Sequence, residues 1–259
     1  MALPVSIQLY SIEDELEKDP RAVLRALSEM GYNGIEPHGG EYLYGLTADE
    51  FISLTRELGL SVPSAHISYE TLTEKTDATL AFHKSLGCKY LAIPYMFHEK
   101  LPGGENHEGV YENMMQICRR AKDFGITLCY HNHEIEFTRL EGKYIMEHLL
   151  DNVPEMKAEY DTGWMMSMGE YPPEYLQAHA DKCALIHLKD FYRPIGVTEG
   201  RPEFRPVGYG VQNIPHIMDA AEKAGAEWLV VEQDDPAFGL SRLETAEMSI
   251  KYIRTLQGK

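Results

Sequence analysis

The chain repeats one pattern of hydrophobic and polar positions along most of its length. An amphipathic helical stretch ends at a glycine, and a short apolar run rich in β-branched or aromatic residues follows within a few positions. The pattern is clearest for five pairs of segments: 22–30 with 34–36, 51–58 with 61–67, 79–86 with 90–96, 114–124 with 126–131, and 217–224 with 227–232. Glycine just after a helix adopts the left-handed conformation at no steric cost, so each pair predicts a helix that leads into a strand.

Two helix starts are also marked in the sequence. Asp19 followed by Pro20 is typical of an N-cap with proline at the first helical position. Thr47 with Glu50 three residues later is typical of a capping box. We therefore expect helices to begin close to residues 20 and 48.

Three less clearly bounded apolar runs, 5–10, 156–161 and 184–188, complete a set of eight predicted strands. The strands begin near residues 5, 34, 62, 90, 126, 156, 184 and 227, and most of the gaps match the length of one βα unit. Eight such units predict a single (β/α)₈ TIM barrel domain over residues 1–259. A doubly wound sheet is the alternative, but the glycine-rich phosphate turn that it normally carries is missing after Tyr10. Residues 194–210 predict an extended loop over the barrel mouth.

Composition and charge exclude several classes of protein. With 24 basic and 41 acidic residues, the formal charge is −17, which disfavours general binding to nucleic acid or to a membrane surface. No apolar run approaches the roughly 20 residues of a membrane span, and the first residues lack the basic region of a signal peptide. The four cysteines form no C-x-x-C pair, so we interpret them as reduced core residues of a cytoplasmic protein.

Acidic and imidazole side chains gather where the predicted strands end, which is where TIM barrels carry their chemistry. The strand ends supply Glu36, His66, His131, His133, Glu136, Asp161, His187 and Glu232. Carboxylates packed this closely repel one another, and a divalent cation would neutralise them. Mixed carboxylate and imidazole ligands without a thiolate favour Mn²⁺, Co²⁺ or Mg²⁺, although Zn²⁺ stays open. The alternative is a polar barrel mouth stabilised by ordinary salt bridges to Lys189 and Arg193.

Five motifs carry a resemblance to a known family. They are the runs 130–137 (YHNHEIEF), 159–163 (EYDTG), 186–190 (IHLKD), 206–210 (PVGYG) and 231–234 (VEQD). Together they resemble the sugar phosphate isomerase/epimerase family of the xylose isomerase-like TIM barrel superfamily. The resemblance spans essentially the whole chain, with its specific motifs in the second half.

The resemblance implies one divalent metal, held by residues of the fifth to eighth strands beneath a polyhydroxylated substrate. Asp161, His187 and Glu232 match the family pattern, whereas His131 stands where ketose epimerases have a glutamate. Either His131 is the ligand, or Glu136 reaches back to the metal and leaves His131 free as a base. We prefer Glu136 because hard cations favour oxygen ligands. The predicted metal ligands are therefore Glu136, Asp161, His187 and Glu232, with Mn²⁺ as the first choice of ion.

The predicted function is a metal-dependent isomerase or epimerase that acts on a sugar or sugar phosphate through an enediolate. His131, His133 and Glu232 are the predicted proton-transfer residues. Predicted substrate contacts are Glu36, His66, Trp164, Lys189 and Arg193.

Two other functions remain open. The tyrosine-histidine-x-histidine form of the fifth strand also resembles the inosose dehydratase branch, which makes a lyase acting on inosose or 3-keto sugars the second hypothesis. A non-catalytic sugar-binding barrel is the third. The sequence predicts a small sugar as partner and leaves open whether the chain forms a homo-oligomer.

Overall fold

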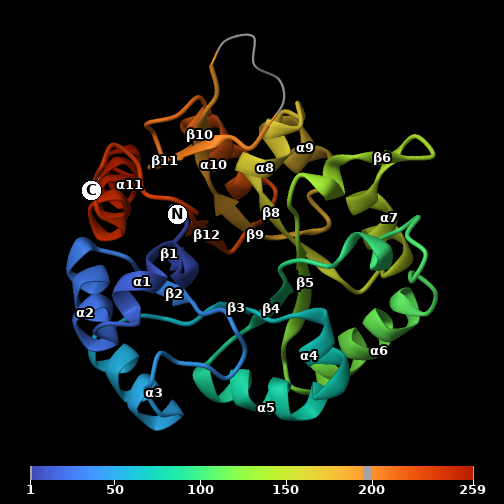
Figure 1. Cartoon of the computed structure of the whole chain (residues 1–259), viewed down its shortest axis with the longest axis horizontal. Coiled ribbons are helices and arrows are strands. Elements are labelled where there is room, and N and C mark those ends of the chain that lie inside the picture. The colour runs from blue at the N-terminus through green and yellow to red at the C-terminus, as the bar shows by residue number, and fades with distance from the viewer. Residues whose placement is uncertain (1, 195–199, 259) are drawn as a thin grey trace.

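A parallel eight-stranded barrel ringed by helices forms the body of the molecule (Figure 1). The computed structural model describes residues 2–194 and 200–258. Around the barrel the strands follow the order β2-β1-β12-β9-β8-β5-β4-β3. They are β1 Val5–Gln8, β2 Gly34–Glu36, β3 Ser64–His66, β4 Tyr90–Ile93, β5 Thr127–His131, β8 Lys157–Asp161, β9 Cys183–Leu188 and β12 Trp228–Val231. The isolated bridges Gly34–Ser61 and His38–His66 join β2 to the β3 side, so the barrel is nearly closed and the predicted TIM barrel is confirmed.

Helices connect successive strands on the outside of the barrel. The α-helices are α1 Glu13–Leu16, α2 Pro20–Met30, α3 Ala48–Glu57, α4 Tyr69–Glu74, α5 Thr76–Leu86, α6 Val110–Asp123, α7 Ile145–Asn152, α8 Thr162–Ser167, α9 Pro172–Ala178, α10 Ile214–Lys223 and α11 Arg242–Leu256. Short 3₁₀ helices are η1 Leu9–Ile12, η2 His98–Lys100 and η3 Ile135–Phe137. Helix α11, at the red end of the chain, packs beside the blue α2, so the two ends of the chain complete the ring (Figure 1).

The predicted helix boundaries are confirmed by their caps. The Asp19 carboxylate accepts the N–H of Ala22 at the start of α2, and Pro20 is its first residue. Thr47 and Glu50 form both halves of a capping box at α3. Gly31 ends α2 with φ of 97°, the left-handed conformation that favours glycine.

The interior of the barrel changes from apolar to polar along its axis. Tyr90, Ala92, Cys129 and Leu185 pack together as a separate hydrophobic cluster inside the barrel. Two residues further towards the C-terminal ends of β5 and β9, the side chains that point into the barrel are polar. The barrel thus presents a packed base and a polar mouth. All four cysteines are buried free thiols, and none of the described helices is long and apolar enough to cross a membrane.

The predicted loop over residues 194–210 is partly wrong. Residues 195–199 lie outside the described residues, but β11 Glu203–Arg205 pairs antiparallel with β10 Asp190–Tyr192. After this ribbon the chain folds back over the Asp190 carboxylate, which accepts the backbone N–H groups of Phe191, Gly208, Gly210 and Gln212 at 2.9–3.2 Å. Glycine is required at 210, since a Cβ there would lie 2.1 Å from the Asp190 carboxylate.

We expect Asp190→Ala to lower the free energy of unfolding by about 3 kcal/mol, because it strands several backbone donors around a buried position. Urea denaturation measures the change. Asp219→Ala is the matched control, since Asp219 is exposed and pairs with Lys223 one helical turn away, and it should change stability by less than about 0.5 kcal/mol. Equal effects of the two substitutions would contradict the structural role of Asp190.

Candidate metal centre and active site

Four buried side chains from consecutive barrel strands meet at the mouth. We call them the upper group: His131 at the end of β5, Asp161 at the end of β8, His187 on β9 and Glu232 directly after β12. Their ligand-capable atoms all lie within 4.8 Å of one another. The parallel register brings them together, since Asp161 pairs with His187 and His187 with Val230, two residues before Glu232.

Asp161 is held so that one carboxylate oxygen faces this group. Its Oδ1 accepts the N–H of Trp164 at 2.8 Å and so caps α8. The Asn132 amide binds the Asp161 backbone through both its N–H and its carbonyl oxygen. The other oxygen, Oδ2, is buried without a hydrogen-bond partner, and it lies 3.4 Å from the Lys189 ammonium and 3.9 Å from Nε2 of His131. A native protein rarely leaves a buried carboxylate oxygen unsatisfied, so Oδ2 is available to a cation.

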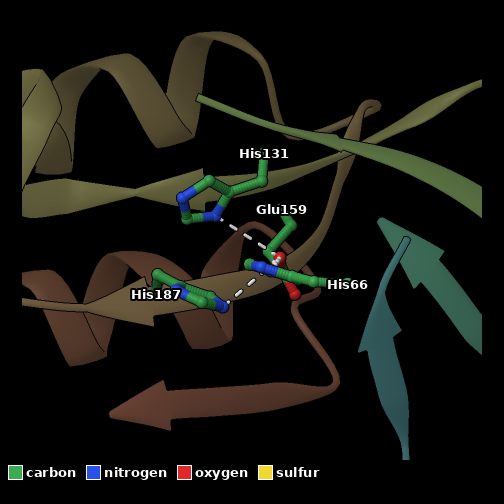
Figure 2. Close-up of side chains that lie close together, drawn as sticks. All are labelled: His66, His131, Glu159 and His187. Atoms are coloured by element: carbon green, nitrogen blue, oxygen red, sulfur yellow. Dashed lines mark hydrogen bonds and ion pairs between the residues drawn. The ribbon is translucent and has the colours of Figure 1, made fainter. Parts of the chain in front are cut away.

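A second set of polar side chains lies deeper in the barrel, and it is built around Glu159 (Figure 2). Glu159 precedes Asp161 by two residues on β8 and therefore shares its inward face. Its Oε2 lies 2.6 Å from Nε2 of His66, 3.3 Å from Nε2 of His187 and 3.4 Å from Nδ1 of His131. Figure 2 shows these three imidazoles converging on the single carboxylate. We call Glu159, His66, His131 and His187 the lower group.

Glu36 is the second carboxylate at this depth. Its Oε1 lies 3.0 Å from Nε2 of His66 and 2.9 Å from Nε2 of His187. Gln8 donates to Oε1 at 2.7 Å, and the Ser64 hydroxyl donates to Oε2. The Glu36 carboxylate, which has no solvent exposure, is therefore fully occupied by neighbours.

The electrostatics of the lower group favour ion pairs in spite of burial. Burial opposes a charge on His66, but the carboxylates of Glu36 and Glu159 outweigh it and raise the pKa of His66 to about 9. Burial and the neighbouring Glu36 oppose ionisation of Glu159, yet the imidazoles of His187 and His66 lower its pKa to about 2. The carboxylates are therefore charged and attract the ring nitrogens that face them.

His131 and His187 belong to both groups, and in each ring one nitrogen faces the upper group while the other faces the lower group. His187 directs Nε2 at Glu36 and Glu159, while its Nδ1 lies 3.1 Å from Glu232 in the upper group. His131 directs Nδ1 at Glu159 and Nε2 at Asp161. Carboxylates behind a metal-binding histidine orient the ring and fix which nitrogen carries the proton. The donor set of the upper group, with an Asp161 oxygen that accepts no hydrogen bond, therefore fits a divalent metal, with the lower group as its support.

Lys189 is buried beside the upper group and neutralises much of its charge. Its ammonium lies 2.7 Å from Asp234, 2.9 Å from Glu232 and 3.4 Å from Asp161. It also stands 5.2 Å above the Trp164 ring. The chain passes this close because residue 163 is glycine, where a Cβ would lie 2.8 Å from the Lys189 side chain. The salt bridges expected for Lys189 are thus present, whereas Arg193 donates to the carbonyl groups of Ser167 and Gly200.

A cavity of about 500 Å³ opens above the upper group. His66, His131, His133, Trp164 and Glu232 line it, which brings five of the residues singled out in the sequence to one surface. Burial and the nearby Lys189 lower the pKa of His133 to about 4, and its Nδ1 has no hydrogen-bond partner. His133 is therefore neutral near pH 7 and retains an unpaired nitrogen.

Two of the predicted site residues lie apart from the upper group and the cavity lining. Glu36, a predicted substrate contact, is buried in the lower layer and is absent from the cavity lining. Glu136, the preferred strand-five ligand, belongs to neither group, because its two oxygens accept the Tyr130 hydroxyl at 2.8 Å and the His133 N–H at 2.7 Å. Burial raises the pKa of this carboxyl to about 7. His131, the alternative, occupies the strand-five position in both groups.

Sequence reasoning assigned no role to Glu159 or Asp234, which hold the histidines and Lys189. The sequence signal that could have identified them is their spacing of two residues from a predicted ligand. Glu159 is two residues before Asp161, and Asp234 is two residues after Glu232. In extended backbone, side chains two residues apart share a face.

Comparisons with known proteins agree with the fold. The family model described as xylose isomerase-like TIM barrel matches residues 24–256, so the chain belongs to that family. The inosose dehydratase of Geobacillus thermodenitrificans is 24% identical over 77% of this chain and 78% of its own length. A crystal structure of a sugar phosphate isomerase/epimerase from Parabacteroides distasonis superposes with a TM-score of 0.81 at 25% identity, covering 97% of each chain. A structure of the IOLI protein with a bound zinc atom superposes with a TM-score of 0.70 at 15% identity, covering 98% of each chain.

We expect Asp161→Asn to weaken binding of Mn²⁺ by about 100-fold or more, since loss of an outer-shell partner alone costs about 10- to 100-fold. Glu136→Gln is the matched control, because its carboxylate lies outside the upper group, and it should retain one ion per chain. Equilibrium dialysis with elemental analysis measures both. If Glu136→Gln empties the site while Asp161→Asn retains the ion, the ligand assignment is wrong.

Metal binding should release protons, and its affinity should fall as the pH drops through about 6. Burial raises the pKa of Asp161 to about 6, and the carboxylates of Glu159 and Glu36 hold the pKa of His187 above its usual range. Both groups must lose a proton before they can bind a cation, so higher pH favours binding. Calorimetric titration of Mn²⁺ in buffers of different ionisation enthalpy measures the release. A binding heat that does not depend on the buffer would contradict this expectation.

Proposed function

We propose that the protein is a divalent-metal-dependent sugar isomerase or epimerase. The observation that carries the proposal is the upper group, two imidazoles and two carboxylates whose members His131 and Glu232 line a cavity large enough for a sugar. His131, Asp161, His187 and Glu232 would hold the ion, with Mn²⁺ as our first choice. When bound, such an ion polarises a carbonyl and its neighbouring hydroxyl, which makes the adjacent C–H more acidic.

Two side chains that face the same cavity could move the proton. His133 stands at the cavity wall, 5.0 Å from His131 between ring centres, and its buried Nδ1 has no hydrogen-bond partner. Glu232 approaches from the β12 side, with its Oε2 held by Lys189 and His187. An epimerase needs one base on each face of the reacting carbon, and these two residues come from different sides of the mouth. We therefore assign proton removal to His133 for one epimer and to Glu232 for the other. The residue on the opposite face takes a proton from solvent and delivers it to the carbon, and the base then releases its own proton to solvent.

The buried cation of Lys189 supports this chemistry without donating its own proton. Three carboxylates surround the ammonium, and they outweigh burial to hold its pKa above the usual range. Lys189 therefore stays charged and orients Glu232. Trp164 beneath the same ammonium offers a flat surface on which a sugar ring could stack.

A dehydratase acting on inosose or a 3-keto sugar is the second candidate. It is favoured by the names of the curated relatives, which are inosose dehydratases, and by the histidine at position 131. The first step is the same in both reactions, namely removal of the proton next to a carbonyl. In the dehydratase, the imidazolium of His133 would then protonate a departing hydroxyl instead of leaving the proton to return to carbon.

Incubation with sugars in deuterated water separates the candidates. The Mn²⁺-loaded protein is given ketoses, aldoses, 3-keto sugars and inosose, and products are read by NMR and mass spectrometry. An isomerase or epimerase places deuterium on the carbon next to the carbonyl of an intact sugar, whereas a dehydratase yields a product lighter by one water. His133→Gln should bind the metal but exchange about 10²- to 10⁴-fold more slowly.

Neither label nor dehydration across the panel, with metal bound, would contradict both enzymatic candidates. That result would leave the non-catalytic sugar-binding barrel. Unchanged exchange in His133→Gln would remove His133 from the mechanism and leave Glu232 as the base.

A further inference from the structure

A second cavity adjoins the first across a shared wall. Its volume is about 680 Å³, and Tyr95, His133 and Trp164 line both cavities. Each cavity alone falls in the size range of about 300–1,000 Å³ that holds a small-molecule ligand. The mouth therefore has room for a molecule longer than one sugar ring, with the join beside His133.

The walls of the two cavities differ in chemistry. The first is lined by imidazoles and carboxylates, as required for a polyhydroxylated ring. The second is lined by apolar surfaces from Tyr95, Ile135, Trp164, Met168 and Pro202. Tyr95 and Met168 are 46% and 43% exposed, although both are large apolar side chains. Exposed apolar side chains gathered in a hollow are typical of a ligand site.

The charges around the second cavity disfavour an anionic occupant. Arg201 is paired with Asp234 and with Asp235, each at 3.0 Å. Arg193 is held by the carbonyl groups of Ser167 and Gly200. Glu134 adds a carboxylate to the lining. A phosphate placed here would have to displace the partners that already hold both arginines, and it would meet the Glu134 carboxylate.

We propose that the second cavity binds an uncharged aromatic substituent of the substrate, so that the substrate class is a sugar with an aromatic group attached. The sugar ring occupies the first cavity and the aromatic ring the second, with Tyr95 and Trp164 contacting the junction. This substrate class rests on the proposed function of the first cavity. Offset or edge contacts with these two rings would add to the burial of apolar area.

Binding to the Mn²⁺-loaded protein tests the proposal without turnover. Calorimetry compares glucose, glucose 6-phosphate and the two anomers of 4-nitrophenyl glucoside. At least one anomer of the aryl glucoside should bind about tenfold or more tightly than glucose, because a buried ring removes apolar area from water. Glucose 6-phosphate should bind no more tightly than glucose.

A charge placed in the second cavity supplies the matched variant. Met168 lines only that cavity, so Met168→Glu should cut the preference for the aryl glucoside over glucose by about tenfold. Leu256→Glu introduces the same charge at an exposed apolar residue at the end of α11, outside both cavities, and should leave the preference unchanged.

Two outcomes overturn the proposal. One is an aryl glucoside that binds no more tightly than glucose in either anomer. The other is a preference for glucose 6-phosphate that added salt weakens, which would make the second cavity a phosphate site. Neither outcome affects the deuterium experiment, because that experiment measures proton exchange in the first cavity. Conversely, failure of the deuterium experiment would not alter the measured preference for the aryl glucoside over glucose.

Discussion

The burial of two carboxylates inside the barrel is the constraint on which the site depends. Glu36 and Glu159 have no solvent exposure and would be costly to ionise without partners. His66 and His187 supply those partners, each with one ring nitrogen between the two carboxylates. Because one nitrogen of His187 is bound below, the other is directed upward at Glu232. The lower group therefore sets the geometry of the upper group.

The need of buried charged groups for partners also explains why the side chains at the barrel mouth have several contacts each. One oxygen of Asp161 caps the N-terminus of α8. The Lys189 side chain lies between Trp164 and three carboxylates, and the absence of a Cβ at Gly163 leaves room for it. These contacts hold the side chains of Asp161 and Lys189 in fixed orientations. An active site needs such preorganised groups, since small errors in position weaken both metal binding and proton transfer.

The two adjoining cavities differ in the balance of polar and apolar side chains that line them. Imidazoles and carboxylates gather over the barrel axis, where four strands deliver them. Apolar side chains from the segments after β4, β5 and β8 form the second cavity beside it. In the function proposed here, substrate choice would depend on the segments beyond the strand ends, and the reaction on the residues that the strands deliver.

The sequence by itself determined the barrel and most of the candidate ligands. Repeated helix-glycine-strand units and caps such as Asp19 and Thr47 depend on local backbone preferences, which a short segment expresses wherever it lies. The sequence also predicted that Asp161, His187 and Glu232 would lie close together, because parallel strands bring their carboxyl ends to one face. The role of Glu136 was not readable, since its position six residues after Tyr130 does not show that it turns back to accept that hydroxyl. The contact between Glu36 and His187 spans 151 residues, and the second cavity is shared by segments as far apart in sequence as Tyr95 and Pro202. Only the tertiary structure decided these, because closing the barrel determines which buried charges meet and which surfaces stay open.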